Sequence, residues 1–216
     1  MVEDGDVVEI DYVGRVQESG EIFDLTSEEV ADEEGYETEE MELGPVKVLV
    51  GAGHVIPGLE SALKGMEAGD EETVAVDAED AFGERSGDDI ETFSRSEFEE
   101  YDVEPRRGIV VEIDGRRGKI VSASAGRVRV DFNHPLAGKD LEYDVEVLDV
   151  AADVEERVEA VLAYYGLDEL DPDIDIDDGA VTVTVAEGLD NPQLVEQLED
   201  ELVRVNGVET AEIAAS

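Results

Sequence analysis

The sequence predicts an α+β protein with an inserted small β-rich domain and a C-terminal small α+β domain. Three observations lead to this prediction. Short runs typical of strands surround one helical stretch in the first 84 residues and return near residue 141. A middle segment differs in charge from both flanks, and after residue 153 helical and strand patterns follow one another. We therefore expect domains at 1–84 plus 133–150, at 85–132 and at 151–216.

The first unit is predicted to consist of strands around a short helix. Runs rich in Val, Ile and Tyr predict strands at 6–16, 21–24, 46–50, 73–76 and 141–150. Residues 55–65 place Ile56, Leu59 and Leu63 on one face, which predicts the helix. Residues 24–43 contain ten acidic residues, no basic residue and no sustained period, so we expect a solvated loop there.

The middle segment, residues 85–129, is nearly neutral. It holds nine of the 15 Lys and Arg residues and ten acidic ones, whereas the other 171 residues hold six and 51. Its β-like runs predict short strands at 108–113, 118–123 and 126–132. A local change of composition within a chain indicates an inserted domain. The strand at 141–150 could then complete the sheet begun before the insert.

The last unit alternates helices and strands. An amphipathic pattern begins at residue 153 and ends at Gly166, which predicts a helix. Residues 180–186 (AVTVTVA) have the period of a strand. Asn191 is a good N-cap for a second helix, which we expect to run to Gly207. Residues 208–213 predict the final strand.

No metal site is predicted. The run DPDIDIDDG at 171–179 resembles a calcium loop, but the closing Glu position holds Thr184. Its alternating Ile and Asp residues favour an edge strand with a charged face. His54 and His134, in a chain without Cys, make a weak case for metal binding. The missing Cys also excludes disulfides and thiolate catalysis.

The composition is strongly acidic, with 61 Asp and Glu against 15 Lys and Arg and a formal charge of −46. Such a chain should repel nucleic acid and anionic membranes. Few lysines among many carboxylates are expected of a protein from a high-salt cytoplasm, such as that of a halophilic archaeon. No apolar run has the length of a membrane span, and the first residues lack the apolar core of a signal peptide. We therefore expect a cytoplasmic protein.

Several motifs occur in a defined order. They are VEIDYVG at 8–14, FD at 23–24, VIPGLE at 55–60, DAFG at 80–83 and NHPLAGKDLEYDVEV at 133–147. In this order they resemble the FKBP family of peptidyl-prolyl cis-trans isomerases over about 150 residues. The NHPLAGK run, and an insert between DAFG and that run, are similar to the SlyD-type branch. The resemblance implies an antiparallel half-barrel wrapped on one short helix.

The resemblance also implies a prolyl pocket between the helix and the concave face of the sheet. Val46 matches that pocket more weakly than the residues below. The floor residue, often Trp in the family, is Leu59 here, and the pocket Tyr of many members is Phe82. The expected pocket residues are Tyr12, Phe23, Asp24, Val55, Ile56, Leu59, Phe82 and Tyr143.

This reaction requires no cofactor. Amide resonance opposes rotation about a peptide bond with a barrier of roughly 18–20 kcal/mol, and no bond is broken. The twisted transition state has a less polar carbonyl, so a dry apolar pocket favours it over the planar ground state. The expected partners are unfolded or partly folded proline-containing polypeptides. The resemblance further implies that the insert is a chaperone-like holder of such clients.

Other interpretations remain open at this stage. Each pocket residue alone could be plain core, and Asp24 could be one more loop acid. Because Phe82 lacks a hydroxyl, the chain could instead be a holdase with a vestigial pocket. The acidic run could contact cation-rich clients, and an acidic mimic of nucleic acid is a further possibility. The last unit could serve dimerisation or client binding, and the sequence does not define the oligomeric state.

Overall fold

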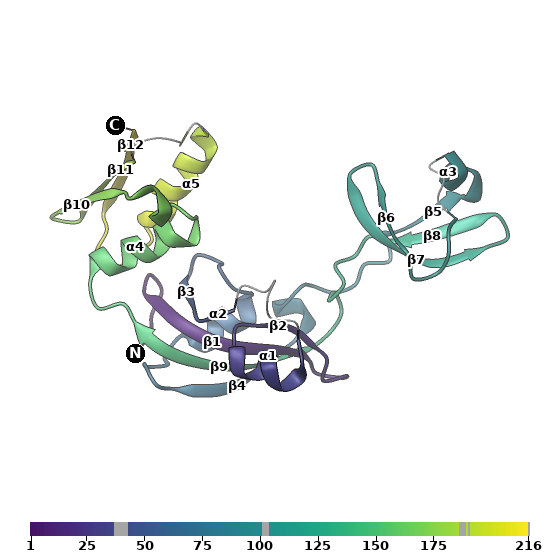
Figure 1. Ribbon diagram of the computed structural model, residues 1–216, viewed down its shortest axis with the longest axis horizontal. Helices are drawn as coiled ribbons and strands as arrows, with labels where there is room; N and C mark the ends of the chain where they lie inside the picture. Colours follow the sequence, from purple (N-terminus) through teal and green to yellow (C-terminus); the bar gives the residue numbers. More distant parts are fainter. Residues whose placement is uncertain (37–42, 101–103, 186–188, 190, 216) are drawn as a thin grey trace.

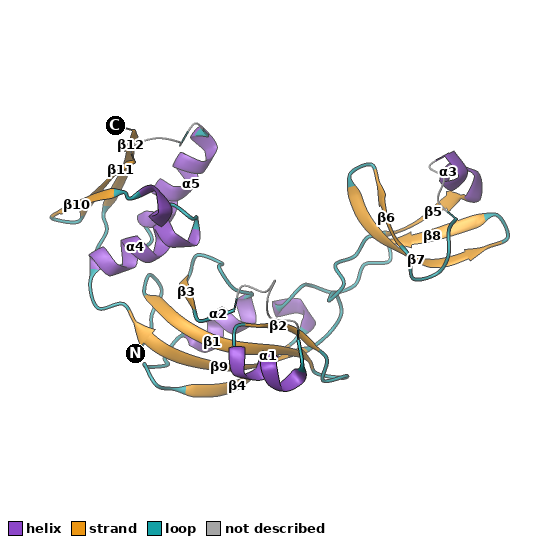
Figure 2. Ribbon diagram, in the orientation of Figure 1, coloured by secondary structure: helices purple, strands orange, loops and turns teal. Residues whose placement is uncertain are grey.

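The computed structural model describes residues 1–36, 43–100, 104–185, 189 and 191–215. Its strands form three separate sheets, one in each part of the chain (Figure 1, Figure 2). The first sheet lies between the insert and the C-terminal part, and the insert extends away from it on two chain segments (Figure 1). This arrangement is the predicted α+β fold with an inserted β-rich domain and a C-terminal α+β domain.

The first sheet is antiparallel and has β1 and β9 at its centre. Its order is β2-β1-β9-β4, with β3 also paired to β1. Helix α2 packs on one face, where Leu59 and Leu63 are buried against Ile10 and Tyr143. The elements are β1 (Val7–Val16), β2 (Ile22–Leu25), α1 (Glu28–Glu34), β3 (Val46–Leu49), α2 (Pro57–Leu63), β4 (Glu71–Val76), the 3-10 turn η2 (Ala78–Asp80) and β9 (Leu141–Val150).

Helix α1 corrects one prediction, because it lies in the acidic run 24–43 that was expected to be a loop. The Ser27 side chain caps it by accepting a hydrogen bond from the Val30 N–H at 3.5 Å. Ala31 is fully buried among residues of β1 and β2. A cap and one buried side chain are enough for two helical turns, although they leave no sustained period. Residues 37–42 of that run lie outside the described residues.

The insert is a four-stranded antiparallel sheet of order β5-β8-β7-β6 with one covering helix. Its core joins Phe98 of the helix to Ile120, Val128 and Val130 of the sheet. The sequence did not predict β5 or α3, because both are short and their apolar residues follow no regular period. The elements are β5 (Ile90–Ser94), α3 (Arg95–Glu100), β6 (Val110–Ile113), β7 (Arg116–Ser124) and β8 (Arg127–Asp131).

The C-terminal sheet has the order β10-β11-β12, antiparallel at the first pair and parallel at the second. The predicted edge strand is β10. Helix α5 ends at Leu202, earlier than predicted, since the following N–H groups of Arg204 and Val205 bond three residues back instead of four. The elements are α4 (Val154–Tyr164), the 3-10 turn η3 (Asp168–Leu170), β10 (Asp173–Asp177), β11 (Ala180–Val185), α5 (Pro192–Leu202) and β12 (Thr210–Ala215).

The C-terminal domain shares a core with the first sheet. Val7 of β1 and Leu49 of β3 are buried in the same cluster as Val158 of α4 and Leu198 and Leu202 of α5. The two parts therefore bury apolar surface against each other, which favours a fixed arrangement over a flexible tether. None of the helices described is both long enough and apolar enough to cross a membrane.

Candidate active site

The site is built around the start of helix α2, where the chain turns onto the face of the first sheet. Pro57 occupies the first turn of α2, a position at which its fixed φ and missing N–H suit a helix. The next residue, Gly58, lies directly against Val76 of β4, since a Cβ atom at Gly58 would come within 2.3 Å of Val76 Cγ1. The glycine therefore lets the helix approach the sheet closely, which places the preceding Val55 and Ile56 over it.

A cavity of about 380 Å³ opens between this helix start and the sheet. Seven of the eight residues predicted for the pocket line it, all except Phe23. Leu59 forms its buried floor, only 1% exposed. The residues that line the cavity are Tyr12, Asp24, Gly53, His54, Val55, Ile56, Pro57, Leu59, Phe82 and Tyr143.

Aromatic rings form one wall of this cavity. Phe23 supports it from behind, because its ring meets Tyr143 and Phe82 edge to face, with centroids 5.7 and 6.3 Å apart. Tyr12 meets Tyr143 in the same manner at 5.7 Å. Such pairs contribute about 0.5–1.5 kcal/mol each beyond the area that they bury. These contacts between the rings therefore hold the wall in shape. Val46, the weaker match, packs at the edge of the same core.

The polar part of the cavity includes Tyr12 and Asp24. The Tyr12 hydroxyl donates a hydrogen bond to Asp24 Oδ2 at 2.9 Å. Burial, and then the Asp24 charge and this hydrogen bond, raise the pKa of Tyr12 far above its ordinary value of 10.0. Burial and the Asp24 charge raise the pKa of Tyr143 in the same direction. Both phenols therefore stay protonated and remain hydrogen-bond donors throughout the physiological range.

The two histidines have roles that the sequence did not reveal. His134 stacks on the ring of Phe82, with centroids 4.2 Å apart and planes 10° from parallel. His54 lines the cavity and also contacts Glu201 of the C-terminal domain. Within the described ranges, no three His, Cys, Asp or Glu side chains gather closely enough to hold a metal ion. The partners of both histidines are distant in sequence, so no local pattern could have identified them.

Comparisons with known proteins agree on one family. A short-type peptidyl-prolyl cis-trans isomerase from Methanocaldococcus jannaschii is 37% identical over 150 residues, which are 69% of this chain and 94% of that protein. An FKBP-type 16 kDa peptidyl-prolyl cis-trans isomerase from Escherichia coli is 37% identical over 49% of this chain and 74% of its own. The isomerase SlyD from E. coli is 35% identical over 53% of this chain and 60% of its own.

Two further similarities concern parts of the chain or the fold. The family model described as "FKBP26, IF domain" matches residues 95–136. The crystal structure of FkpA from E. coli is similar at 20% identity and a TM-score of 0.34, over 68% of this chain and 41% of that chain.

The antiparallel sheet with its aromatic cavity, together with these relatives, defines the class of protein. The chain belongs to the FKBP-type peptidyl-prolyl cis-trans isomerases.

Proposed function

We propose that the cavity at the start of α2 is the prolyl pocket, and that its eight predicted residues carry out the isomerase reaction. The supporting observation is that seven of them line one cavity whose floor is Leu59 and in which the Tyr12 hydroxyl donates a hydrogen bond to Asp24. In this proposal the proline ring of the substrate lies on Leu59, against the aromatic wall. Tyr12 and Asp24 supply the directed polar contacts that orient the substrate.

Catalysis then follows from differential solvation. The planar amide is polar, so water stabilises it strongly. The twisted transition state has lost resonance and is less polar, so excluding water destabilises it less than the planar form. A pocket that binds the twisted form better than the planar form lowers the barrier. Lowering it by about 4 kcal/mol accelerates the reaction roughly a thousandfold. No covalent step and no proton transfer are needed.

The test is the cis-to-trans rate of a short X–Pro peptide in high salt. We expect catalysis by the intact chain and a loss of at least about tenfold in kcat/KM for Phe82→Asp, because a charge in the aromatic wall favours a hydrated cavity. Leu148→Asp is the matched control, since Leu148 is 38% exposed on β9 and does not line the cavity. Unchanged catalysis by a folded Phe82→Asp variant would contradict the proposed pocket.

We further propose that the insert holds unfolded or partly folded proline-containing chains beside this pocket. Ile109, just before strand β6, and Val110, its first residue, are 38% and 47% exposed, and β6 is an edge of its sheet. An edge strand has backbone groups free to pair with an extended peptide. The alternative function, a holdase with a weak or vestigial isomerase pocket, is favoured by the same two residues and by Phe82 in place of Tyr.

Variants of the insert distinguish client holding from peptide isomerisation. Replacing both Ile109 and Val110 with serine should weaken suppression of aggregation of an unfolded client, measured by light scattering, and leave the short-peptide rate unaltered. Val203→Ser is the control, since Val203 is equally exposed, at 44%, in the C-terminal domain. Normal suppression by the double variant would contradict a client site at β6. An intact chain without peptide catalysis would favour the holdase.

We also propose that the domains divide at 1–84 plus 133–150, at 85–132 and at 151–216. The separation of the three sheets supports this division.

A cytoplasmic location and a high-salt habitat are supported by the charge of −46 and the absence of Cys from the 216 residues. Because that charge repels polyanions, clients of this protein are polypeptides and not nucleic acids.

A further inference from the structure

The loop between β3 and α2 is held from within its own domain. The backbone N–H groups of Gly51 and Gly53 both donate to Glu60 Oε1 of helix α2, at 2.8 and 3.1 Å. The loop then passes through His54 directly into Val55 and Ile56, which line the cavity. A displacement of the His54 backbone would therefore also displace this side of the cavity.

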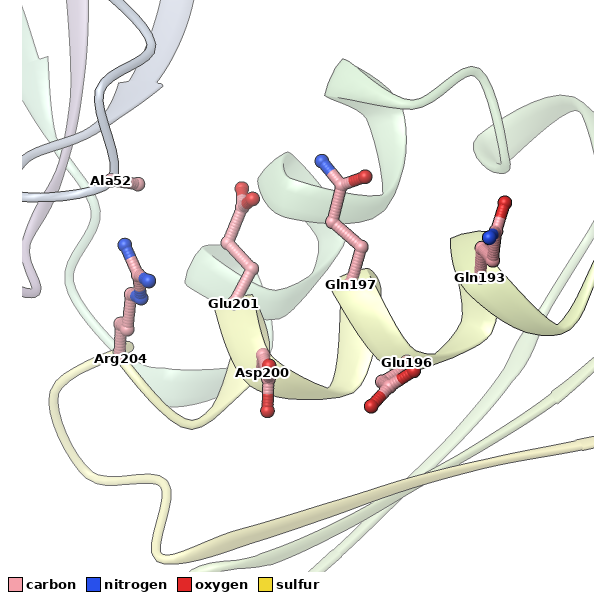
Figure 3. A pocket seen from close by; sticks show the side chains of 7 residues that line it. All are labelled: Ala52, Gln193, Glu196, Gln197, Asp200, Glu201 and Arg204. Atoms are coloured by element: carbon pink, nitrogen blue, oxygen red, sulfur yellow. The ribbon is translucent and has the colours of Figure 1, made fainter.

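The same loop is held from outside by the C-terminal domain. The His54 side chain is only 4% exposed, and its Nε2 lies 2.5 Å from Glu201 Oε1 of helix α5. Its ring stacks on Tyr164 of α4 with centroids 3.8 Å apart and planes 3° from parallel. Both helices of the C-terminal domain thus contact the side chain of His54, a residue that lines the cavity and is followed in sequence by Val55 and Ile56. Figure 3 shows the loop residue Ala52 opposite α5, with Glu201 pointing toward the loop and Asp200 pointing away from it.

The hydrogen-bond partners define the protonation of this pair. His54 Nδ1 accepts a hydrogen bond from the Leu49 N–H at 3.1 Å, so the ring proton must reside on Nε2 and is donated to Glu201. The second carboxylate oxygen of Glu201 accepts a hydrogen bond from the Tyr165 hydroxyl at 2.6 Å. Burial raises the pKa of Glu201, but the bonds from His54 and Tyr165 outweigh it and hold that pKa below 4.5.

We propose that the C-terminal domain positions the prolyl pocket through His54. Because helices α4 and α5 hold the His54 side chain, they fix the position of the segment Val55–Ile56 that follows it. His54 is in this proposal a positioning residue. A buried ring fixed by a hydrogen bond at each nitrogen and stacked on one face has little freedom to turn, so it transmits position well. The inference rests on the proposed location of the prolyl pocket.

A second set of contacts between the same domains provides a control. Asn206 Nδ2 donates to the Asp4 carbonyl and to Asp6 Oδ1, both at 3.0 Å, and Arg157 lies 3.4 Å from Asp6. None of these residues lines the cavity. Removing the Asn206 side chain therefore weakens the attachment of the C-terminal domain without removing a contact to His54.

The test separates the two ends of the His54 ring. In His54→Asn the side-chain oxygen can still accept from the Leu49 N–H but does not reach Glu201. In His54→Gln the longer side chain reaches Glu201. We expect His54→Asn and Glu201→Ala each to lower kcat/KM for a short X–Pro peptide about three- to thirtyfold, and the double variant to lower it no further. His54→Gln should restore much of the rate.

Asn206→Ala should retain the rate of the unaltered chain. Glu196→Ala should also retain it, because Glu196 is exposed on helix α5, the helix that carries Glu201. Thermal melting would establish that every variant is folded. The proposal is overturned if His54→Asn and Glu201→Ala stay within about twofold of the unaltered chain, or if Asn206→Ala lowers the rate as much as they do.

The backbone amide resonances of Val55 and Ile56 provide a readout that does not depend on catalysis. They should shift in His54→Asn and Glu201→Ala and remain in place in Asn206→Ala. If these shifts occur but the Phe82→Asp variant is fully active, the coupling stands and the proposed pocket fails. Unshifted amides would overturn the coupling itself.

Discussion

A Gly58→Ala variant should be less stable than the unaltered chain by about 1–3 kcal/mol and should lose peptide isomerase activity. The new methyl group would lie 2.3 Å from Val76 Cγ1 and 3.0 Å from Cγ2. Val76 is 3% exposed, and β4 cannot retreat easily because it is paired with β9 along its length. Helix α2 must therefore move, and it carries Leu59 and the adjoining cavity wall. Alanine favours helix by about 1 kcal/mol over glycine, which opposes the loss only in part.

Denaturant unfolding in high salt would measure this loss, and the peptide assay would measure activity. Adding Val76→Ala to Gly58→Ala removes the two methyl groups that clash, so the double variant should regain activity. Ser61→Ala, on the exposed face of the same helix, is the control and should change little. A Gly58→Ala variant that is as stable and active as the unaltered chain would show that α2 does not depend on this close approach.

The melting temperature should rise strongly between dilute buffer and molar KCl. The charge of −46 repels itself, and salt screens this repulsion between exposed groups. One source is visible in the strand register, where Glu146 of β9 lies between Asp11 of β1 and Glu71 of β4. Like charges directly opposite each other in a sheet are destabilising. A melting temperature that does not respond to KCl would contradict the proposed adaptation to high salt.

Two substitutions on the same strand test that source. Glu146→Gln should raise the melting temperature in dilute buffer and reduce its rise with KCl, because it removes both like-charge pairs. Glu142→Gln is the matched control, since Glu142 lies on the same face between Arg15 and Ala75. It should leave the melting temperature unchanged or lower it. Equal effects of the two substitutions would mean that total charge matters and local pairing does not.

The fold was predictable where the sequence is regular. The strand expected at 141–150 is β9 itself, and the Asp–Ile alternation of β10 and the Val–Thr alternation of β11 each produced the expected strand. These segments have one buried and one exposed face, so the period in the sequence reflects the structure directly. Helix α1, strand β5 and helix α3 were missed because one or two buried contacts stabilise each of them.

The candidate site was predictable only through ordered motifs. No single residue among Tyr12, Phe82 and Tyr143 indicates a cavity, yet the structure brings all three to one. Phe23 lies behind the wall, because its ring packs against Gly14, where a Cβ atom would come within 2.8 Å of it. The contact between His54 and Glu201 spans 147 residues and involves two common residue types. It becomes apparent only when the two domains are placed together.

The position of the insert also affects the order in which the domains can fold during synthesis. The segment 77–140 separates β4 from β9, which are adjacent strands, and β9 fills the middle of the first sheet. The ribosome therefore synthesises the whole insert before it releases strand β9. Pairing β4 with β9 then requires closing a long loop, and longer loops are slower to close and cost more entropy. Within the part of the chain that the structure describes, the four strands of the insert form a sheet of their own, so they can assemble during this delay. The insert can therefore fold before strand β9 is available to complete the first sheet.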